Sequence, residues 1–562
     1  MTASTSSPAN GTFSLLVTDE IDREGVDILR AVPGFEVDEL PTMPRAELLE
    51  RIGRYDALIG RSATQLPAEV LRRARRLRVI GRAGVGIDNI DMPEATALGI
   101  AVINAPAGNT VAVAELFFGC VISLVRHLPR AAASMRSGRW DRSLLLGTEL
   151  RGRTLGIVGL GRIGGEIALR ARAFEMSLVA YDPYVTDERF ELLRVARAST
   201  LDDLLARADI VTVHTPLNDE TRGMIGAREL KRLRVGSIVV NMARGGIVDE
   251  PALLAALESG ALHGAVLDVY SKEPLAADHP LRSRDDVVLT PHLGASTAEG
   301  QRNVAVDVCE GVRDALLSGE LSRALNVAGV ARSRWLALQP ALLLARRTAA
   351  IARALLADRG ARAVEQVTVR VGSDLADAGS VLLSSAAMGV LEGIAEGERL
   401  NLVNARQRAE SRGILLAATT APGSESEHSV AVTLRCGSAT IVVAGVAAPG
   451  AGPRILRIGD FTVDVAPRRT LLVLRNRDVP GVIGRVGTLL GHAGVNIAEY
   501  HQARMAQGGE ALAAISVDEP IDETLRHQLL ALPDVYTATV VNFGEEGAPS
   551  RAEAEDDTEA ER

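Results

Sequence analysis

Cysteine, aromatic residues and clustered basic residues are scarce in this sequence. Its three cysteines, Cys120, Cys309 and Cys436, are too scattered among 562 residues for a disulfide framework or a cysteine-based metal site. Aromatic residues make up 3% of the chain, and no basic block is interleaved with them, which argues against nucleic-acid binding. We therefore expect a cytoplasmic protein that binds neither a metal nor a nucleic acid.

Long uninterrupted apolar runs are also missing. Arginines interrupt the longest ones, such as residues 341–356, so no membrane-spanning segment is predicted. Residues 1–11 lack the apolar core and cleavage signal of a secretory peptide. The formal net charge is −9, but eight acids and two arginines fall between Glu545 and the end, so residues 544–562 are predicted to be a disordered acidic tail. The length predicts three or four domains.

The most informative stretch is a glycine-rich turn after an apolar run. Residues 155–158 predict a buried strand, and Gly159, Gly161 and Gly164 follow it in the spacing Gly-x-Gly-x-x-Gly. Such glycines permit a tight turn, close approach to a pyrophosphate, and close packing of the next helix. Asp182 ends a second apolar run about 20 residues on, where an acid can accept the ribose hydroxyls of NAD. An ordinary strand–helix–strand crossover with a surface aspartate is the alternative.

Short apolar runs alternate with helical patterns through the first half of the chain, which predicts parallel α/β sheets. In the second unit each run is almost wholly apolar, as expected of strands buried on both faces. The predicted strands are 13–17, 35–37, 57–59, 78–80, 100–104, 155–158, 179–182, 210–214, 237–241, 264–268 and 287–290, and the predicted helices include 22–30, 110–128, 165–174 and 297–317.

The second half of the chain has a different residue pattern. Residues 330–467 begin with an Ala/Leu/Arg-rich helical region and continue with alternating strands such as 366–370 and 430–434. Arg454 and Arg457 could form an anion site there, although a solvated strand face is the alternative. Residues 469–543 show the pattern of a βαββαβ, ferredoxin-like unit.

Three polar residues follow predicted strands at the edge where doubly wound sheets bind ligands. Arg244 precedes Gly245 and Gly246 and could bind a substrate carboxylate in bidentate fashion. His292 is a candidate general acid/base, and Glu273 could pair with it and favour the imidazolium. Structural roles are the alternatives, because a lone His before Leu-Gly, a Glu-Pro and an Arg-Gly-Gly are all common in loops and turns.

Four segments together resemble the D-isomer-specific 2-hydroxyacid dehydrogenases. They are Gly81-Arg82-Ala83-Gly84-Val85-Gly86-Ile87-Asp88-Asn89, Gly159-Leu160-Gly161-Arg162-Ile163-Gly164, Asn241-Met242-Ala243-Arg244-Gly245-Gly246-Ile247-Val248-Asp249-Glu250 and Pro291-His292-Leu293-Gly294-Ala295-Ser296-Thr297. Within that family the chain is most similar to the members that oxidise 3-phosphoglycerate in serine synthesis. The segment Asp478-x-Pro-Gly…Asn496-Ile497 resembles an ACT domain.

The resemblance implies an α/β fold in which a doubly wound NAD domain is inserted in a flavodoxin-like substrate domain. An intervening α/β domain and a ferredoxin-like ACT domain would follow. The expected boundaries are 12–107 and 295–329 for the substrate domain, 108–294 for the NAD domain, 330–467 for the intervening domain and 469–543 for the ACT domain.

The resemblance also implies roles for individual residues. Arg244 would anchor the substrate, His292 would shuttle the proton, and Glu273 would support His292. The residues expected to contact NAD are Val85, Gly159, Gly161, Arg162, Ile163, Gly164, Asp182, Thr215, Ala243, Arg244, Asp268, His292, Gly294 and Ala295. Those expected near the substrate are Arg61, Ser62, Asn109 and Arg142, with Arg82 adding positive potential and Arg142 supplied by a partner subunit. Surface roles for Arg82 and Arg142 remain an equal alternative.

The resemblance further implies 3-phosphoglycerate as substrate, L-serine as an effector at Asp478 and Asn496, and a homodimer or homotetramer formed in part by the helix from Thr110 and the arm around Trp140. Simple turn chemistry is the alternative for Asp478 and Asn496. Other open alternatives are a hydroxypyruvate or glyoxylate reductase, a non-enzymatic NADH sensor, and a relative with altered regulation.

Two positions depart from the family pattern. Glu175 stands where a helix-ending glycine is common, and it is predicted to be strained if its φ is positive. Asp141 lies beside Trp140 where a basic residue is often found, which weakens a cationic phosphate site.

Overall fold

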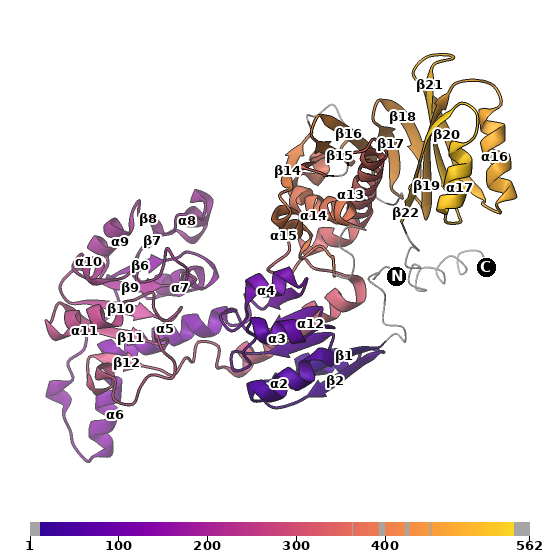
Figure 1. Cartoon of the computed structure of the whole chain (residues 1–562). Coiled ribbons are helices and arrows are strands. Elements are labelled where there is room, and N and C mark those ends of the chain that lie inside the picture. The colour runs from indigo at the N-terminus through magenta and orange to yellow at the C-terminus, as the bar shows by residue number, and fades with distance from the viewer. Residues whose placement is uncertain are drawn as a thin grey trace, which may run out of the picture.

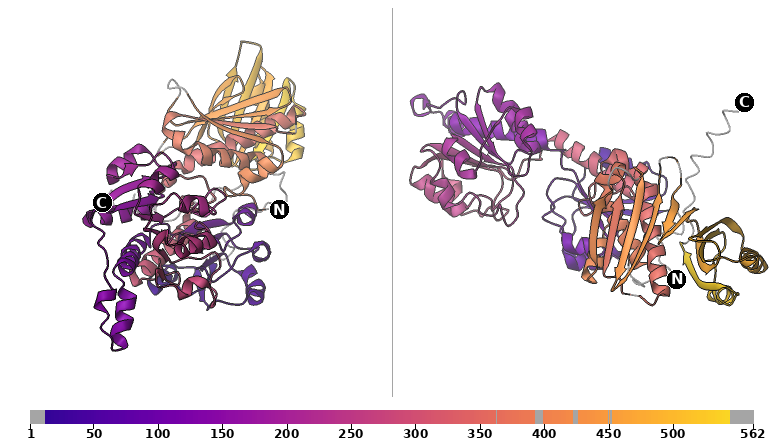
Figure 2. Two further views of the ribbon diagram at one scale, coloured as in Figure 1. Left: turned by 90° about the vertical axis from the view of Figure 1, so that its left-hand side faces the viewer. Right: turned by 90° about the horizontal axis from the view of Figure 1, so that it is seen from above.

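The computed structural model describes residues 12–361, 363–392, 399–421, 426–448, 450 and 452–543. The acidic tail predicted at 544–562 lies outside these residues. The described chain forms four bodies, each built on one sheet, with the fourth body at the end of the molecule far from the second (Figure 1; Figure 2, right).

The first body is a five-stranded parallel sheet in the order β2-β1-β3-β4-β5, the flavodoxin-like order predicted from the sequence. Helix α12 returns to it from the second body and packs on α1 so closely that a Cβ on Gly25 would lie 2.7 Å from Ala305. Its elements are β1 (Phe13–Val17), α1 (Arg23–Arg30), β2 (Phe35–Glu39), α2 (Arg45–Arg51), β3 (Ala57–Gly60), α3 (Ala68–Arg73), β4 (Val79–Arg82), α4 (Met92–Ala97), β5 (Ala101–Asn104) and α12 (Ala298–Ser318).

The second body is a seven-stranded parallel sheet in the order β12-β11-β10-β9-β6-β7-β8. Counted from β6, this is the doubly wound arrangement of dinucleotide-binding proteins, so the predicted fold class is confirmed. The sheet strands are β6 (Thr154–Val158), β7 (Ser177–Tyr181), β8 (Ala196–Arg197), β9 (Ile210–Val213), β10 (Ser237–Asn241), β11 (Leu262–Leu267) and β12 (Val287–Leu289). The helices are α5 (Thr110–Val125), α6 (Leu128–Arg136), α7 (Arg162–Ala173), α8 (Asp187–Leu193), α9 (Leu201–Arg207), α10 (Ala227–Leu230) and α11 (Glu250–Glu258).

The helix predicted from Thr110 to about Leu128 is α5, which ends at Val125, and a second helix, α6, begins at Leu128. His127 has a φ of 53°, and α5 and α6 meet at an angle of 63°. Pro129 explains the break, because it has no N–H group to donate to the carbonyl of Val125, as a continuing α5 would require. Helix α6 consequently projects from the outer end of the second body (Figure 1).

The third body combines two long helices with a six-stranded sheet in the order β14-β13-β15-β16-β17-β18. Only β13 and β14 pair in parallel among its described strands. The elements are α13 (Arg332–Asp358), β13 (Gln366–Val371), α14 (Gly379–Leu391), α15 (Ala405–Ser411), β14 (Leu415–Thr420), β15 (Ser429–Cys436), β16 (Ala439–Val446), β17 (Arg454–Ile458) and β18 (Phe461–Val465).

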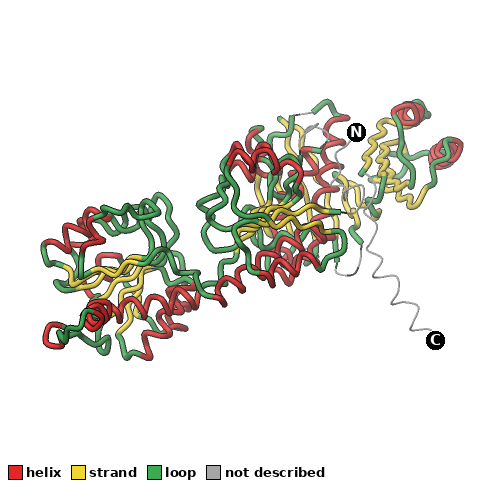
Figure 3. The backbone as a smooth tube through the Cα atoms, turned by 90° about the horizontal axis from the view of Figure 1, so that it is seen from below, coloured by secondary structure: helices red, strands yellow, loops and turns green. Residues whose placement is uncertain are grey.

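The fourth body confirms the predicted βαββαβ pattern. Its antiparallel sheet has the order β20-β21-β19-β22, and both helices cover the same face (Figure 3). The elements are β19 (Thr470–Arg477), α16 (Val482–His492), β20 (Ile497–Arg504), β21 (Glu510–Val517), α17 (Glu523–Leu530) and β22 (Val535–Asn542).

One continuous hydrophobic cluster joins the first, third and fourth bodies. It extends from the α12 face of the first sheet through Trp335 and the rest of α13 to Leu471 and Val473 of β19. Polar contacts reinforce the joint, since Asn401 donates to the carbonyl of Gly99 at 2.8 Å and Arg399 to that of Arg75 at 2.9 Å. No described residue of the second body takes part in this cluster or in these two hydrogen bonds.

Arg454 does not form the free anion site considered from the sequence. Its guanidinium contacts Asp464 and, at 3.1 Å, Glu499 of the fourth body. Arg454 therefore ties the third body to the fourth.

One helical segment, Ser373–Leu391, is long and apolar enough to span a membrane, although sequence inspection predicted none. In this structure 78% of its most apolar window is buried inside the protein, where α14 packs on α13 and β13. Core helices meet the same length and hydropathy criteria.

Glu175 adopts the positive φ that its position after α7 suggested. Its φ is 54°, and its carboxylate pairs with Arg151 at 3.0 Å. Both side chains are largely exposed, so this ion pair offsets little of the backbone strain.

The substitution Glu175→Gly should therefore raise the thermal midpoint of unfolding. Removing the left-handed penalty is worth about 1 kcal/mol, or ~2–4 °C for a body of this size. Scanning calorimetry measures the shift. Glu175→Gln is the control, since it removes the ion pair but keeps the strain and should not stabilise; equal midpoints for the two variants would contradict the interpretation.

Candidate active site

Glu273 and His292 come together at the edge of the second sheet. Glu273 follows β11, His292 follows β12, and the carboxylate Oε2 lies 2.8 Å from the imidazole Nδ1. The hydrogen bond fixes the ring through Nδ1, which leaves Nε2 available to a ligand. The side chains are 50% and 37% exposed for His292 and Glu273, so the pair is open to the cleft.

A buried carboxylate holds the loop that carries His292. Asp268 is fully buried and accepts hydrogen bonds from Thr290 Oγ1 at 2.6 Å, Leu293 N at 2.7 Å and Gly294 N at 2.9 Å. Burial raises the pKa of Asp268, and the three hydrogen bonds oppose that rise. His292 itself has a φ of 55°, a strained conformation that these bonds help to maintain. Asp268, predicted as a cofactor contact, is thus placed as a support for this loop.

Arg244 lies between the first two bodies. Its Nε donates to Asp88 Oδ2 at 3.1 Å, and its Nη1 donates to the carbonyl of Ala243 at 2.6 Å. Asp88 belongs to the loop after β4, so this ion pair crosses from the second body to the first. A Cβ on Gly86 would lie 2.0 Å from Arg244 Nη2, which explains the glycine at that position.

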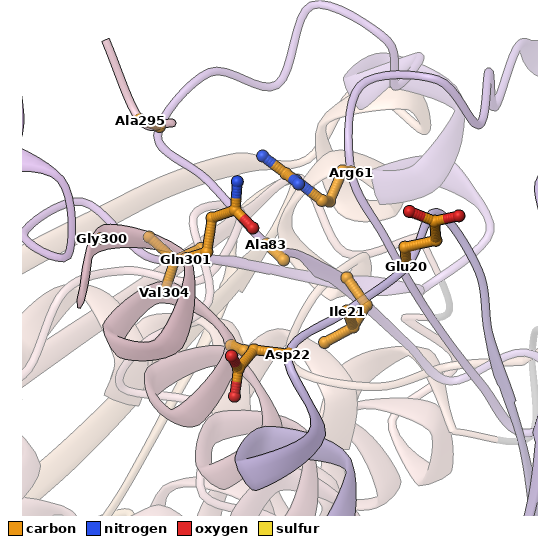
Figure 4. A pocket seen from close by; sticks show the side chains of 10 residues that line it. Glu20, Ile21, Asp22, Arg61, Ala83, Ala295, Gly300, Gln301 and Val304 are labelled. Carbon is orange, nitrogen blue, oxygen red and sulfur yellow. The ribbon is translucent and has the colours of Figure 1, made fainter. Parts of the chain in front are cut away.

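Two further arginines face the same region. Arg82, at the end of β4, has a buried Nε without a hydrogen-bond partner among the described residues. Burial, and then the neighbouring charge of Arg244, lowers the pKa of Arg82 to about 10, so it remains a cation near neutral pH. Arg61 follows β3 and points into a pocket shared with Ala295 and Gln301 (Figure 4). Three guanidinium groups from the ends of three strands thus converge on one cleft, where a multiply charged anion would offset their mutual repulsion.

The glycine-rich turn fits a dinucleotide. Gly159 has a φ of 93°, and a Cβ on Gly164 would lie 2.1 Å from the carbonyl oxygen of Gly159. Gly161 faces open space at the start of α7, whose first N–H groups receive no side-chain cap. The N-terminus of α7, with Arg162 and Ile163, is therefore free to receive a pyrophosphate.

Asp182 is held at the end of β7 beside that turn. Its two carboxylate oxygens accept hydrogen bonds from the backbone N–H groups of Leu160 and Tyr184, both at 2.9 Å. Each oxygen keeps a lone pair for a ribose hydroxyl. The free acceptor positions of Asp182 therefore suit the ribose hydroxyls in the adenosine half of NAD.

Other predicted cofactor contacts surround the cleft. Thr215 has a buried hydroxyl without a hydrogen-bond partner among the described residues, and the carbonyl of Val85 accepts from Asn104 at 2.6 Å. Next to Thr215, burial lowers the pKa of His214 to about 3, so that ring is neutral at physiological pH.

Some predicted residues do not join the cleft within one chain. Arg142 follows α6 on the projecting arm, at the outer end of the second body (Figure 1). Its neighbour Asp141 accepts from Ser134 at 2.8 Å and Arg139 at 2.9 Å, and these bonds lower the pKa of Asp141. Asn109 precedes α5, and its buried Oδ1 has no partner among the described residues.

Asp478 and Asn496 lie at opposite ends of the fourth sheet. Asp478 follows β19 and accepts from Arg504 at 3.2 Å and Gly508 N at 3.1 Å. Asn496 precedes β20 and donates to Asp518 at 2.6 Å. A single fourth body therefore does not bring the two predicted effector residues together.

Sequence inspection missed Asp19, Asp88 and Asn89 as contributors to the cleft. Each directly follows or lies close to a predicted strand end on the ligand-binding edge, which is the signal that could have identified them. In the part of the chain described here, no three His, Cys, Asp or Glu side chains are grouped to hold a metal ion.

Two segments of the chain match models of known domain families. Residues 118–294 match the model of the D-isomer specific 2-hydroxyacid dehydrogenase NAD-binding domain, and residues 470–534 match the ACT domain. The chain belongs to the D-isomer-specific 2-hydroxyacid dehydrogenases, a family of NAD-dependent oxidoreductases.

Within that family it groups with the D-3-phosphoglycerate dehydrogenases. It is 39% identical over 535 residues to the D-3-phosphoglycerate dehydrogenase of Synechocystis sp., covering 94% of each chain. It is 38% identical over 535 residues to that of Archaeoglobus fulgidus, covering 94% of this chain and all of the relative. The crystal structure of the TT0316 protein from Thermus thermophilus is 37% identical, with a TM-score of 0.51, and corresponds to 54% of this chain and 97% of its own.

Replacing Asp268 with alanine should destabilise the second body, because two backbone N–H groups and a hydroxyl lose their buried acceptor. The expected loss of about 3 kcal/mol corresponds to a fall of roughly 6–12 °C in the thermal midpoint. Asp249→Ala is the control, because Asp249 caps α11 through one bond to Ala252 N and should cost only about 1 kcal/mol. Similar calorimetric shifts for both variants would refute the role given to Asp268.

Proposed function

We propose that this chain oxidises 3-phosphoglycerate to 3-phosphooxypyruvate with NAD, the first step of serine synthesis by the phosphorylated route. The observation that carries the proposal is the convergence of Arg61, Arg82 and Arg244 beside the Glu273–His292 pair. A substrate with a carboxylate and a phosphate supplies the negative charge that this cluster lacks. The names of the relatives matched over nearly the full chain support the same substrate.

In the proposed mechanism, Arg244 binds the substrate carboxylate and polarises the C2 oxygen, while Arg61, Ser62 and Arg82 receive the phosphate end. His292 Nε2 removes the proton of the C2 hydroxyl, and Glu273 stabilises the imidazolium through Nδ1. The chemistry supplied by bound NAD is acceptance of the hydride from C2. Asp268 keeps the His292 loop in place.

We infer that a second copy completes the site as a homodimer, or as part of a homotetramer. The arm after α5 exposes apolar side chains that a monomer would leave in water: Met135, Trp140, Leu144 and Leu146 are 57%, 77%, 69% and 88% exposed. Arg142 lies among them, so pairing through these arms would carry it to the neighbouring cleft. A cytoplasmic location is consistent with the low cysteine content.

We further propose that L-serine is the effector of the fourth body. β20 is an edge strand, and antiparallel pairing of β20 with the β20 of a second copy would set the start of one strand beside the end of the other. Asn496 precedes the start and Asp478 contacts Arg504 at the end. Such pairing would bring Asp478 and Asn496 of different copies together.

Formation of NADH from 3-phosphoglycerate and NAD at alkaline pH, with a trap for the keto product, tests the proposed reaction. His292→Asn should lower kcat by about 10²- to 10⁴-fold because the proton acceptor is lost. Arg244→Ala should lower kcat/KM by about 100-fold or more, through both a lower kcat and a higher KM. His279→Asn, a histidine of the same body that pairs with Glu250, is the control and should retain activity.

Several outcomes would count against the proposal. Full activity in His292→Asn would remove that residue from the mechanism. Folded, NAD-binding protein that reduces hydroxypyruvate or glyoxylate but leaves 3-phosphoglycerate untouched would assign a different hydroxy acid.

Adding L-serine to the same assay tests the effector. We expect serine to suppress turnover, and Asp478→Ala to shift half-inhibition at least tenfold upward by removing a ligand of the composite site. Asp460→Ala, an exposed acid in the β17–β18 turn, should leave inhibition unchanged. Turnover indifferent to serine would assign Asp478 and Asn496 to turn formation alone.

A further inference from the structure

Two consecutive non-glycine residues after β1 adopt left-handed backbone conformations. Asp19 and Glu20 have φ values of 64° and 53°. Such residues are unfavourable, and they persist where the surrounding structure fixes them. They lie between the carboxyl ends of β1 and β3, which is the point where the strand order of a flavodoxin-like sheet reverses and where ligands bind.

The unusual backbone directs the Asp19 carboxylate into the loop after β3, residues 61–64. Oδ2 accepts from the backbone N–H groups of Arg61 at 2.8 Å and Thr64 at 2.9 Å. Oδ1 accepts from the hydroxyls of Thr64 at 2.7 Å and Thr42 at 2.6 Å. Asp19 is only 8% exposed; burial raises the pKa of this carboxyl, but the four hydrogen bonds outweigh burial and lower it.

Asn89 holds the same loop from the opposite side. Its Nδ2 donates to the carbonyls of Arg61 at 2.9 Å and Thr64 at 2.7 Å. The N–H and C=O groups of both Arg61 and Thr64 are therefore bound by two side chains. The bonds to the Asp19 carboxylate are charge-assisted and therefore stronger than bonds between neutral groups, and together with those from Asn89 they leave the loop little freedom to move.

The loop that carries Asn89 also contacts Arg244, the other arginine proposed to bind the substrate. Asp88, the residue before Asn89, accepts from Arg244 Nε at 3.1 Å. Adjacent residues of one loop thus orient Arg244 directly and Arg61 through its backbone. Arg61 points from the loop into the pocket that also contains Ala295, three residues after His292 (Figure 4).

We propose that Asp19 is a positioning residue for substrate recognition: its carboxylate, with Asn89 opposite, fixes loop 61–64 so that Arg61 faces the phosphate end of the substrate. The inference rests on the proposed function for the identity of that substrate. Asp19 does not touch the reacting atoms; it acts through Arg61.

The test compares Asp19→Asn with Asp56→Asn. Asp56 is also a buried carboxylate of the same sheet, 2% exposed, but it precedes β3 at the opposite edge and accepts from Ser14 N and Arg76. Asp19→Asn replaces one acceptor oxygen by a donor, so loop 61–64 loses part of its support. We expect the KM for 3-phosphoglycerate to rise about tenfold or more, with kcat changed less than threefold and the KM for NAD unchanged.

Asp56→Asn should lower the thermal midpoint without moving the KM for 3-phosphoglycerate. An unchanged KM in Asp19→Asn, or an equal rise in both variants, would overturn the proposal.

A second measurement does not depend on turnover. Hydrogen–deuterium exchange of the Arg61 and Thr64 amides should become at least tenfold faster in Asp19→Asn and stay unchanged in Asp56→Asn. If wild-type protein fails to oxidise 3-phosphoglycerate, the proposed function fails, while the exchange rates still decide whether Asp19 fixes the loop. Undiminished protection of these amides would overturn the inference.

Discussion

The active site depends on the directionality of parallel sheets. Every strand of the first two bodies delivers its carboxyl end to one edge, and those edges face a common cleft: Arg244 after β10 meets Asp88 after β4, and Arg61 after β3 shares a pocket with Ala295 after β12. Buried apolar strands therefore set the positions of charged side chains that lie far apart in the sequence. The reacting side chains lie at or just after the strand ends, and the sheets fix where those ends lie relative to one another.

The strand ends at this cleft carry three cations, which nearby acids neutralise only in part. Arg61, Arg82 and Arg244 lie close enough for Arg61 and Arg244 to depress the pKa of Arg82, while Asp88 is the acid that contacts Arg244 directly. Two buried carboxylates with unlike tasks support this arrangement: Asp268 fixes the loop of His292, and Asp19 fixes the loop of Arg61. Both accept backbone N–H groups, and both accompany residues with positive φ. Near the cleft, buried carboxylates thus hold in place the loops whose backbone is strained.

Sequence patterns predicted much of this fold because the responsible physics is local. Apolar runs marked the strands, the glycine spacing marked the turn at Gly159, and polar residues after strands marked Arg244 and His292. Contacts between distant segments were not accessible in the same way. The support of loop 61–64 by Asp19 and Asn89, the burial of Asp268 and the pairing of Arg454 with Glu499 all depend on tertiary placement. The helix from Thr110 was predicted to end near Leu128, beside Pro129, whereas the following helix α6 was not predicted.

The hydrophobic cluster that runs from α12 through α13 to β19 has a consequence for the evolution of the chain. The Thermus thermophilus structure corresponds over 97% of its own length to only 54% of this chain, so a similar fold exists in a chain of about half this length. In the present chain, however, the face beneath Trp335 is apolar and shared. A descendant that lost its C-terminal half would expose that face to water and would need new polar residues there to stay in solution. The C-terminal half has thereby become difficult to discard, whatever ligand it binds.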